Sequence, residues 1–320
     1  MNEARSSGPL IDRDSAAALR EPLTELVIRA GAAILSLNRA AMKIDGKADG
    51  SPVTEADLVS DRIIAEGLEW LIPDVPVLSE ECVHLAKPPY GGSFFLIDPL
   101  DGTREFVAGR NEFTVNLALV TNGTPLLGII GAPALGLIWR GLVGRGAERL
   151  TTGRGSAAEP IHTRPLPKRG EPWIVAVSRS HGDIRTEAFI DARPGAIRQK
   201  LGSAVKFGRV AEGGADIYPR LSPTSEWDIA AGRMLLQAAV RFAAGAPGAQ
   251  RDRDLAPQPA AGLNIDRLVD RFRTHPHVLV AGELDEQSVA DLLRRPPLPQ
   301  LAGDVLTQPA VLGEFGLFRA

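Results

Sequence analysis

The chain has 320 residues, about two domain lengths, with 44% hydrophobic and 23% charged residues and a formal net charge of −3. This composition is typical of a globular protein, and it argues against a disordered or fibrous chain and against a strongly basic nucleic-acid-binding surface. The single cysteine, Cys82, excludes a disulfide framework and a multi-cysteine zinc site, and it fits a reducing compartment.

Apolar residues at helical spacing predict three long helices. The first covers residues 19–37. The second begins at Thr54 and ends before Pro73, and the third covers residues 225–240. Apolar runs between turn residues predict strands at residues 75–78, 93–97 and 173–177.

A hairpin is predicted around Asn122-Gly123, a favoured tight-turn dipeptide, with strands at residues 115–120 and 126–130. It lies in an uncharged stretch, residues 113–139, which polar and turn residues divide into runs too short to span a membrane. The first twenty residues carry charges throughout and do not resemble a secretory signal. We therefore expect no transmembrane segment and a cytoplasmic protein.

Interleaved helices and strands predict a layered α/β fold. The Gly-, Pro- and basic-rich segment 151–170 is expected to join two halves. These are an N-terminal α+β half at residues 17–150 and a C-terminal α/β half at residues 171–290, with flexible or atypical tails at residues 1–16 and 296–320. No clear periodicity is present after about residue 243.

Four short segments hold acidic residues where a loop or a helix start would present them. They are Thr54–Asp57, Ser79–Glu81, Asp98–Thr103 and Trp227–Gly232. Each also has a simpler interpretation. Thr54-x-x-Asp57 and Ser225-x-x-Asp228 fit helix capping boxes, Glu80-Glu81 fits a solvated acidic pair, and Asp98–Thr103 fits a strand followed by a turn that Pro99 initiates.

The segment around Asp98 is the most informative of the four. Asp98 follows a buried strand, and a turn after Pro99 would return Asp101 to its side and expose the carbonyl of Leu100. Two carboxylates and a carbonyl this close together would repel one another unless a hard cation lay between them, and Mg²⁺ prefers oxygen ligands of this kind. Because Pro99 stands two residues before Asp101, where haloacid-dehalogenase-type phosphatases have a nucleophilic Asp, we expect no covalent phospho-aspartate.

The four segments, in this order, resemble the lithium-sensitive, magnesium-dependent phosphatase superfamily that includes inositol monophosphatase. Within it, the chain is similar to the bacterial 3′(2′),5′-bisphosphate nucleotidases over about residues 19–240. The matching segments are Ser51–Asp57, Leu78–Glu81, Asp98–Phe106, Glu112–Asn116, Ser178–His181 and Gly202–Gly232. The resemblance implies an αβαβα layered sandwich. It weakens after residue 243, where the closing turn and strand of the family are hard to recognise.

The resemblance also implies roles for individual residues. The implied metal ligands are Glu80, Asp98, the Leu100 carbonyl, Asp101 and Asp228, for two Mg²⁺ ions and a third, weakly held one. The implied catalytic residues are Asp57, Thr103 and Glu80. The implied substrate contacts are Gly102, Thr103, Ser203, Lys206, Arg220, His181 and Asp228. Taken alone, Lys206 and Arg220 would fit solvated surface cations, and His181 would fit a hydrogen-bonded loop residue.

The activity implied by the resemblance is hydrolysis of the 3′-phosphate of adenosine 3′,5′-bisphosphate to AMP and phosphate by a metal-activated water, in the setting of sulfur assimilation. The expected partner is this small-molecule substrate and no nucleic acid polymer. A homodimer and peripheral association with the cytoplasmic face of the inner membrane are further expectations. Two alternatives stay open. One is an inositol monophosphatase or sugar-phosphate phosphatase, and the other is a non-catalytic phosphonucleotide-binding protein.

Overall fold

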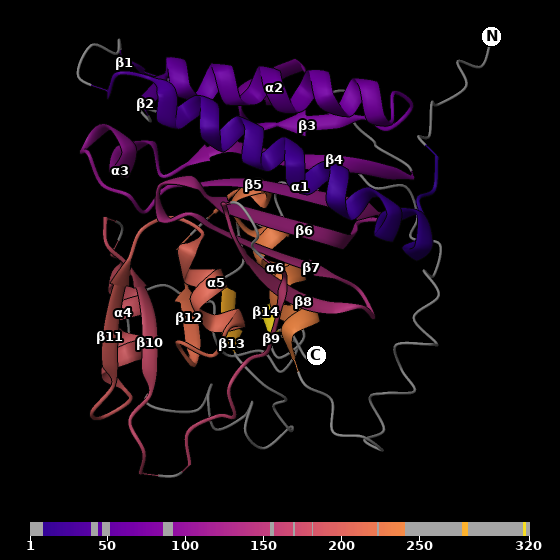
Figure 1. Cartoon of the computed structure of the whole chain (residues 1–320). Coiled ribbons are helices and arrows are strands. Elements are labelled where there is room, and N and C mark those ends of the chain that lie inside the picture. Colours follow the sequence, from indigo (N-terminus) through magenta and orange to yellow (C-terminus); the bar gives the residue numbers. More distant parts are fainter. Residues whose placement is uncertain are drawn as a thin grey trace, which may run out of the picture.

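A computed structural model describes residues 9–39, 44–46, 52–85, 92–153, 157–168, 170–180, 182–222, 224–240, 277–280 and 316–317. Its elements lie in five layers (Figure 1). The first four are α1 with α2, a seven-stranded sheet, α5 with α6, and a five-stranded sheet, whose outer face α4 covers as the fifth. This confirms the expected αβαβα sandwich.

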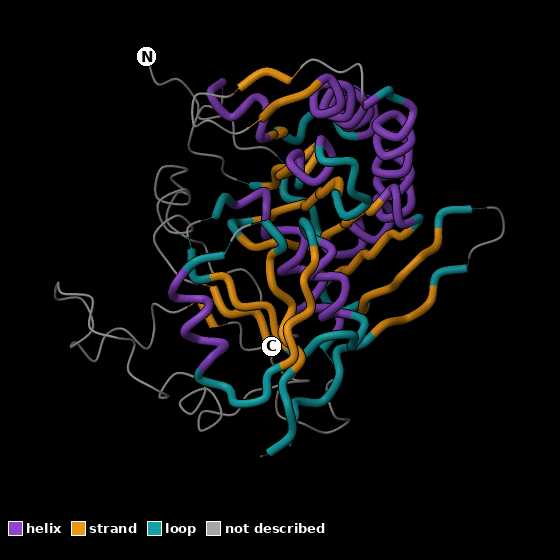
Figure 2. The backbone as a smooth tube through the Cα atoms, turned by 90° about the vertical axis from the view of Figure 1, so that its left-hand side faces the viewer, coloured by secondary structure: helices purple, strands orange, loops and turns teal. Residues whose placement is uncertain are grey.

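The outer helix layer begins at side-chain caps. Helix α1 (Arg13–Ser36) starts earlier than predicted, because Asp12 accepts a hydrogen bond from the Ser15 amide at 2.7 Å and caps the helix before its apolar stripe begins. Helix α2 (Glu55–Leu71) starts as predicted after Thr54. Both helices lie over one face of the large sheet (Figure 2).

The large sheet has the order β3-β4-β5-β6-β7-β8-β9, with β3 parallel to β4 and the other pairs antiparallel. Its strands are β3 (Val77–Ser79), β4 (Ser93–Asp101), β5 (Thr114–Thr121), β6 (Thr124–Ala132), β7 (Leu137–Leu142), β8 (Gly146–Thr151) and β9 (Glu159–Ile161). A separate pair, β1 (Ile44–Gly46) and β2 (Pro52–Thr54), precedes α2. The hairpin prediction is confirmed, with φ of 50° at Asn122 and 75° at Gly123. Strand β9 lies within the segment expected to join the halves.

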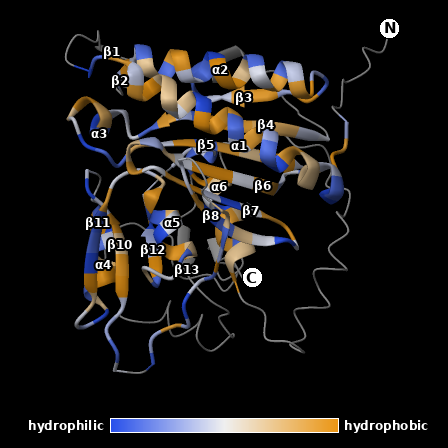
Figure 3. Ribbon diagram, in the orientation of Figure 1, coloured by the Kyte–Doolittle hydropathy of each residue, from blue (hydrophilic) through white to orange (hydrophobic). Residues whose placement is uncertain are grey.

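Strand β4 shows why its sequence is continuously apolar. Phe95 and Ile97 pack in the core with α1 and α2, whereas Phe94 and Leu96 pack on the opposite face in the core with α5 and α6. A strand covered on both faces loses the polar alternation of a half-exposed strand. The central strands β4, β5 and β6 are accordingly mostly apolar along their length (Figure 3).

The small sheet has the order β11-β10-β12-β13-β14. Its strands are β10 (Ile174–Ser178), β11 (Ile197–Leu201), β12 (Ile217–Arg220), β13 (His277–Val280) and β14 (Gly316–Leu317). Helix α4 (Ile184–Asp191) packs through Ile190 on one face, against Val175 and Ile217. Helices α5 (Val205–Ala211) and α6 (Glu226–Ala239) fill the space between the two sheets.

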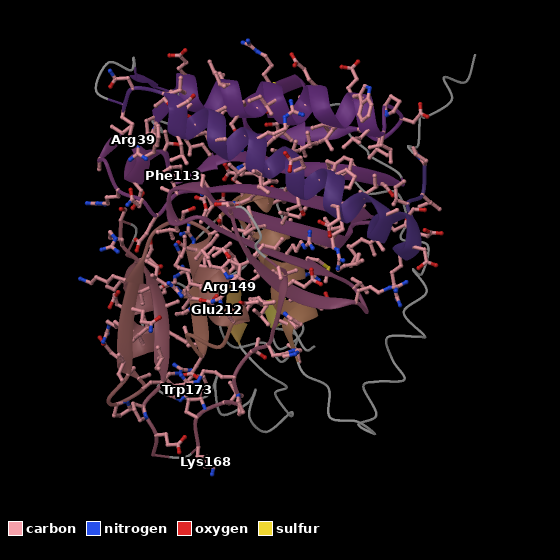
Figure 4. All side chains as sticks on the ribbon, in the orientation of Figure 1. Arg39, Phe113, Arg149, Lys168, Trp173 and Glu212 are labelled. Carbon is pink, nitrogen blue, oxygen red and sulfur yellow. The ribbon has the colours of Figure 1, made fainter. Side chains whose placement is uncertain are left out.

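The middle layer is also tied to the large sheet by charge. Glu212 directly follows α5 and accepts a hydrogen bond from Trp139 of β7 at 3.0 Å and one from Arg149 of β8 at 3.3 Å (Figure 4). Residues 9–16 of the predicted N-terminal tail are described, and Arg13–Ala16 begin helix α1. Residues 1–8 and the region after residue 240, apart from the short strands β13 and β14, lie outside the described residues. None of the described helices combines the length and hydropathy of a membrane span.

Candidate active site

A β-bulge at the end of β4 brings two acidic residues to one face of the sheet. Asp98 pairs with Asn116 and Asp101 pairs with Thr114, so three steps along β4 match two along β5. Residues three apart in a regular strand face opposite sides, whereas the bulge turns both carboxylates toward the α6 side. The prediction that the strand ends at residue 97 and is followed by a turn is wrong. The strand continues to Asp101, because a bulge accommodates Pro99, which has no amide hydrogen to donate.

Asp57 serves the helix and the site with different oxygens. Its Oδ2 accepts hydrogen bonds from the Thr54 amide at 2.8 Å and the Thr54 hydroxyl at 2.7 Å, which completes the capping box of α2. Its Oδ1 accepts from the Thr103 hydroxyl at 3.1 Å. The capping interpretation is therefore correct, and it leaves one oxygen directed at the predicted catalytic partner.

The Thr103 hydroxyl also lies 3.2 Å from the carbonyl oxygen of Leu100, a second acceptor. Thr103 is the first residue of the short helix α3 (Thr103–Val107), and Gly102 before it has a φ of 90°. Only glycine adopts this left-handed conformation without strain, so the turn from β4 into α3 needs Gly102. On the outer side of α3, the Arg39 guanidinium lies over the rings of Phe106 and Phe113, 4.5 and 5.0 Å from their centroids (Figure 4).

The acidic residues from three elements influence one another. Burial raises the pKa of Asp98 well above its usual value, and the neighbouring charges of Glu80, Asp101 and Asp228 raise it further. Burial and the charge of Asp101 also raise the pKa of Asp228 to about 6, although a hydrogen bond from Thr224 opposes the shift. A buried group of like charges in which ionisation is this costly favours a bound cation.

The side chains of this group are not arranged as a finished ligand shell. Within the described ranges, no three His, Cys, Asp or Glu residues are grouped so that they could hold a metal ion. Asp98 instead hydrogen-bonds Glu80, Asp101 accepts from Ser203 at 2.7 Å, and Asp228 accepts from Thr224 at 2.7 Å. The oxygen-only donor set and the mutual repulsion of its members nevertheless fit a hard divalent cation.

Asp228 reaches the site from the first turn of α6. Its Oδ2 also accepts from the Ser225 amide at 3.2 Å, so the predicted capping box is present here too. Helix α6 rests on β6 and β7, where Gly128 and Gly141 leave room for its backbone. Glu80, Asp98 and Asp101 therefore come from the predicted N-terminal half, and Asp228 comes from the predicted C-terminal half.

Ser203, predicted to contact substrate, has its hydroxyl directed at the acidic group. Its Oγ donates to Oδ2 of Asp101 at 2.7 Å, lies 3.0 Å from the Asp101 carbonyl oxygen and hydrogen-bonds the Thr114 hydroxyl. Sequence patterns gave no signal for this contact, because the serine and the aspartate lie about a hundred positions apart and meet only in the folded chain.

Lys206 is not the solvated surface cation that its sequence context alone would suggest. Only 4% of its surface is exposed, its ammonium donates to the Ser203 carbonyl, and it lies 5.2 Å from the centroid of the Tyr218 ring. Burial lowers the pKa of Lys206 to about 8, and the nearby charge of Arg220 lowers it further, whereas Asp101 opposes the shift.

Arg220, at the end of β12, is the second cation beside the acidic group. Burial acts to lower its pKa, but its interactions with Tyr218 and with the carboxylates of Asp228 and Asp101 raise the pKa overall. Tyr218 was not predicted as a site residue, because an aromatic residue in a strand usually belongs to the core. Predicted contact His181 lies outside the described residues.

Sequence comparison relates the chain to one protein family and to named bacterial enzymes. The profile described as "Inositol monophosphatase family" matches residues 16–241. The 3′(2′),5′-bisphosphate nucleotidases CysQ of Escherichia coli K12 and Salmonella typhimurium LT2 are each 38% identical over 227 residues, which is 68% of this chain and 87% of theirs.

Solved structures agree with this match. CysQ from Bacteroides thetaiotaomicron, a bacterial member of the inositol monophosphatase family, is 30% identical with a TM-score of 0.54 over 69% of this chain and 86% of that one. The IMPase of Thermotoga maritima is 26% identical with a TM-score of 0.56 over 70% and 83%.

Proposed function

Because the chain belongs to the inositol monophosphatase family, we propose that it is a metal-dependent phosphatase that converts adenosine 3′,5′-bisphosphate to AMP and phosphate. The observation that carries the proposal is the pair of cations, buried Lys206 and largely buried Arg220, beside the acidic group. A substrate with two phosphates needs a metal at the scissile one and a cationic clamp at the other. An ester with one phosphate has no second phosphate for Lys206 and Arg220 to bind.

The oxygens of Glu80, Asp98, Asp101 and Asp228, with the Leu100 carbonyl, are the groups that would hold Mg²⁺, as two ions and a third bound more weakly. When bound, the metal supplies Lewis-acid activation of water and phosphate. The Thr103 hydroxyl has one proton, directed toward Asp57 or the Leu100 carbonyl, so its lone pairs are left to accept a hydrogen bond from the attacking water. A proton from that water then passes through Thr103 to Asp57.

The remaining residues position the substrate. The Gly102 and Thr103 backbone lies beside Asp101, where the scissile phosphate would bind. Lys206 and Arg220 hold the second phosphate, and the family resemblance implies a contact between His181 and the nucleoside. The contact between Asp57 and Thr103 argues against a purely binding protein, because retention of a ligand does not need a proton acceptor. A cytoplasmic location, association with the inner membrane and a homodimer stay predictions.

The test compares phosphate release from adenosine 3′,5′-bisphosphate and inositol 1-phosphate, each with Mg²⁺ and with chelator. We expect Mg²⁺-dependent turnover with a preference for the nucleotide. Replacing a charged partner costs about 2 kcal/mol, so Lys206→Met and Arg220→Met should each lower kcat/KM for the nucleotide about 30-fold and change the value for a monophosphate far less. A preference for the inositol ester, or equal losses on both substrates, would contradict the nucleotidase assignment.

A further inference from the structure

One carboxylate oxygen joins the two halves of the chain beside the candidate active site. Oε2 of Glu112, just before β5, accepts hydrogen bonds from Nη2 of Arg179 at 2.7 Å and from its Nε at 3.1 Å. The same oxygen accepts from the backbone amide of Gly202 at 2.8 Å. Arg179 follows β10 and Gly202 follows β11, so Glu112 holds the ends of two adjacent strands.

The contact between Glu112 and Gly202 is close enough to involve their backbones. A Cβ atom at Gly202 would lie 2.5 Å from the Glu112 carbonyl oxygen and 2.8 Å from its Cβ. No residue with a side chain can take this place without displacing one of the two segments. The carboxylate bond to the Gly202 amide therefore acts at a point where the halves already touch.

The next residue, Ser203, has a left-handed backbone with a φ of 50°. This conformation costs a non-glycine residue about 1 kcal/mol or more, and it persists where surrounding contacts enforce it. Its hydroxyl bonds Asp101, and its carbonyl accepts from the ammonium of Lys206. The Gly202–Ser203 turn thus contacts both an implied metal ligand and an implied phosphate-binding residue.

We propose that Glu112 is a positioning residue, which holds the Gly202–Ser203 turn against Asp101 and thereby sets the metal affinity of the site and the placement of Lys206. The inference rests on the proposed function for the identity of the metal ligand and of the substrate. Neither Glu112 nor Arg179 is among the residues assigned a role from the sequence.

The positioning role depends on the length of the Glu112 side chain more than on its charge. Glu112 is 21% exposed and Arg179 is 35% exposed, and ion pairs with this much solvent contact contribute at most about 1 kcal/mol. The bond to Gly202 instead fixes backbone next to the strained residue. A second contact between these segments lies one residue away from Arg179, where the Ser180 hydroxyl donates to buried Glu105 of α3.

The experiment separates the effect of side-chain length at position 112 from the effect of its charge. Glu112→Gln keeps an oxygen that can accept from Gly202 but removes the charge, whereas Glu112→Asp keeps the charge but withdraws it by one methylene. The matched control is Glu159→Gln, because Oε2 of Glu159 pairs with Nη2 of Arg149 at the same 2.7 Å distance but on β9, away from the turn.

Two readouts are measured on the full chain. The first is the Mg²⁺ concentration that gives half of the maximal rise in Tm, which needs no turnover. The second is kcat and KM for adenosine 3′,5′-bisphosphate, with p-nitrophenyl phosphate for comparison. Loss of a group that orients a metal ligand typically weakens metal binding about 10-fold or more. We expect such a rise in the Mg²⁺ midpoint and in KM for Glu112→Asp, with kcat changed less, and values within about threefold of wild type for Glu112→Gln and Glu159→Gln.

The proposal is overturned if Glu112→Asp lowers Tm but keeps the wild-type Mg²⁺ midpoint and KM, because Glu112 then contributes only to stability. It is also overturned if Glu112→Gln is as impaired as Glu112→Asp, or if Mg²⁺ does not stabilise the wild type. If Glu112→Asp does not fold, Arg179→Met, which removes the two donors that hold Oε2 of Glu112 beside the Gly202 amide, takes its place, with a Mg²⁺ shift in the same direction expected and an unchanged midpoint contradicting the proposal. If the wild type does not hydrolyse the nucleotide but the Mg²⁺ midpoint shifts as expected, the substrate assignment fails and the positioning role stands.

Discussion

The two oxygens of Asp57 illustrate how one residue serves the fold and the site together. Sequence spacing indicates a helix cap and the family pattern implies a catalytic group, and the structure has both contacts. The oxygen that accepts from Thr54 caps α2, and the other oxygen accepts from Thr103, its predicted catalytic partner. The cap fixes the carboxylate in place, because each oxygen has its own donor.

Replacement of Asp57 by Asn tests this division. The amide keeps the shape but cannot take a proton, so we expect kcat for phosphate release to fall at least about 100-fold. The free energy of unfolding in urea should fall by about 1 kcal/mol, since part of the cap is lost. Thr54→Ala is the control, because it removes the cap hydroxyl and leaves Thr103 untouched. A comparable loss of kcat in Thr54→Ala would show that the cap alone accounts for the effect.

At the scale of elements, glycines on the large sheet set how closely α6 approaches it. A Cβ at Gly128 of β6 would lie 2.4 Å from the carbonyl oxygen of Ala231, and one at Gly141 of β7 would lie 2.9 Å from the Cα of Leu235. Both contacts are with the backbone of the helix, which has no flexible end to move aside. The distance between α6 and the sheet therefore determines where Asp228, in the first turn of the helix, lies relative to Asp98 and Asp101.

Gly128→Ala should therefore affect both stability and activity. Overpacking of a well-packed core costs about 1–3 kcal/mol, and we expect a loss of that size in urea unfolding. The Mg²⁺ concentration needed for half-maximal activity should rise as well, because the helix that carries Asp228 is displaced. Gly182→Ala, where a Cβ meets nothing within 4 Å, should leave stability near wild type. If Gly128→Ala is destabilised but its Mg²⁺ requirement is unchanged, the packing of α6 on the sheet does not influence the candidate metal site.

At the scale of the whole molecule, the acidic group joins the halves. Glu80, Asp98 and Asp101 come from the N-terminal half, and Asp228 comes from the C-terminal half, so their repulsion opposes the native arrangement. A cation bound between them reverses this effect, since it attracts both halves to one point.

Metal removal should consequently weaken the whole fold. A ligand present at about 100 times its Kd stabilises the native state by about 2.7 kcal/mol, and we expect a gain of this order from saturating Mg²⁺ over chelator in urea unfolding. Asp228→Asn should reduce the gain, because it removes one of the carboxylates that would hold the cation. An undiminished Mg²⁺ effect in Asp228→Asn would place the cation elsewhere.

The sequence by itself determined the family, the layered fold class and the set of acidic residues. These follow from local signals, because capping boxes, the Asn122-Gly123 turn and the apolar run of β4 depend on neighbouring residues. Short elements such as α5 and β9 carry too few residues for a period to show. The bulge between Asp98 and Asp101, the burial of Lys206 and the contact of Ser203 with Asp101 were decided only by the tertiary structure. Each depends on contacts between segments distant in the chain, and no local pattern records which segments will meet.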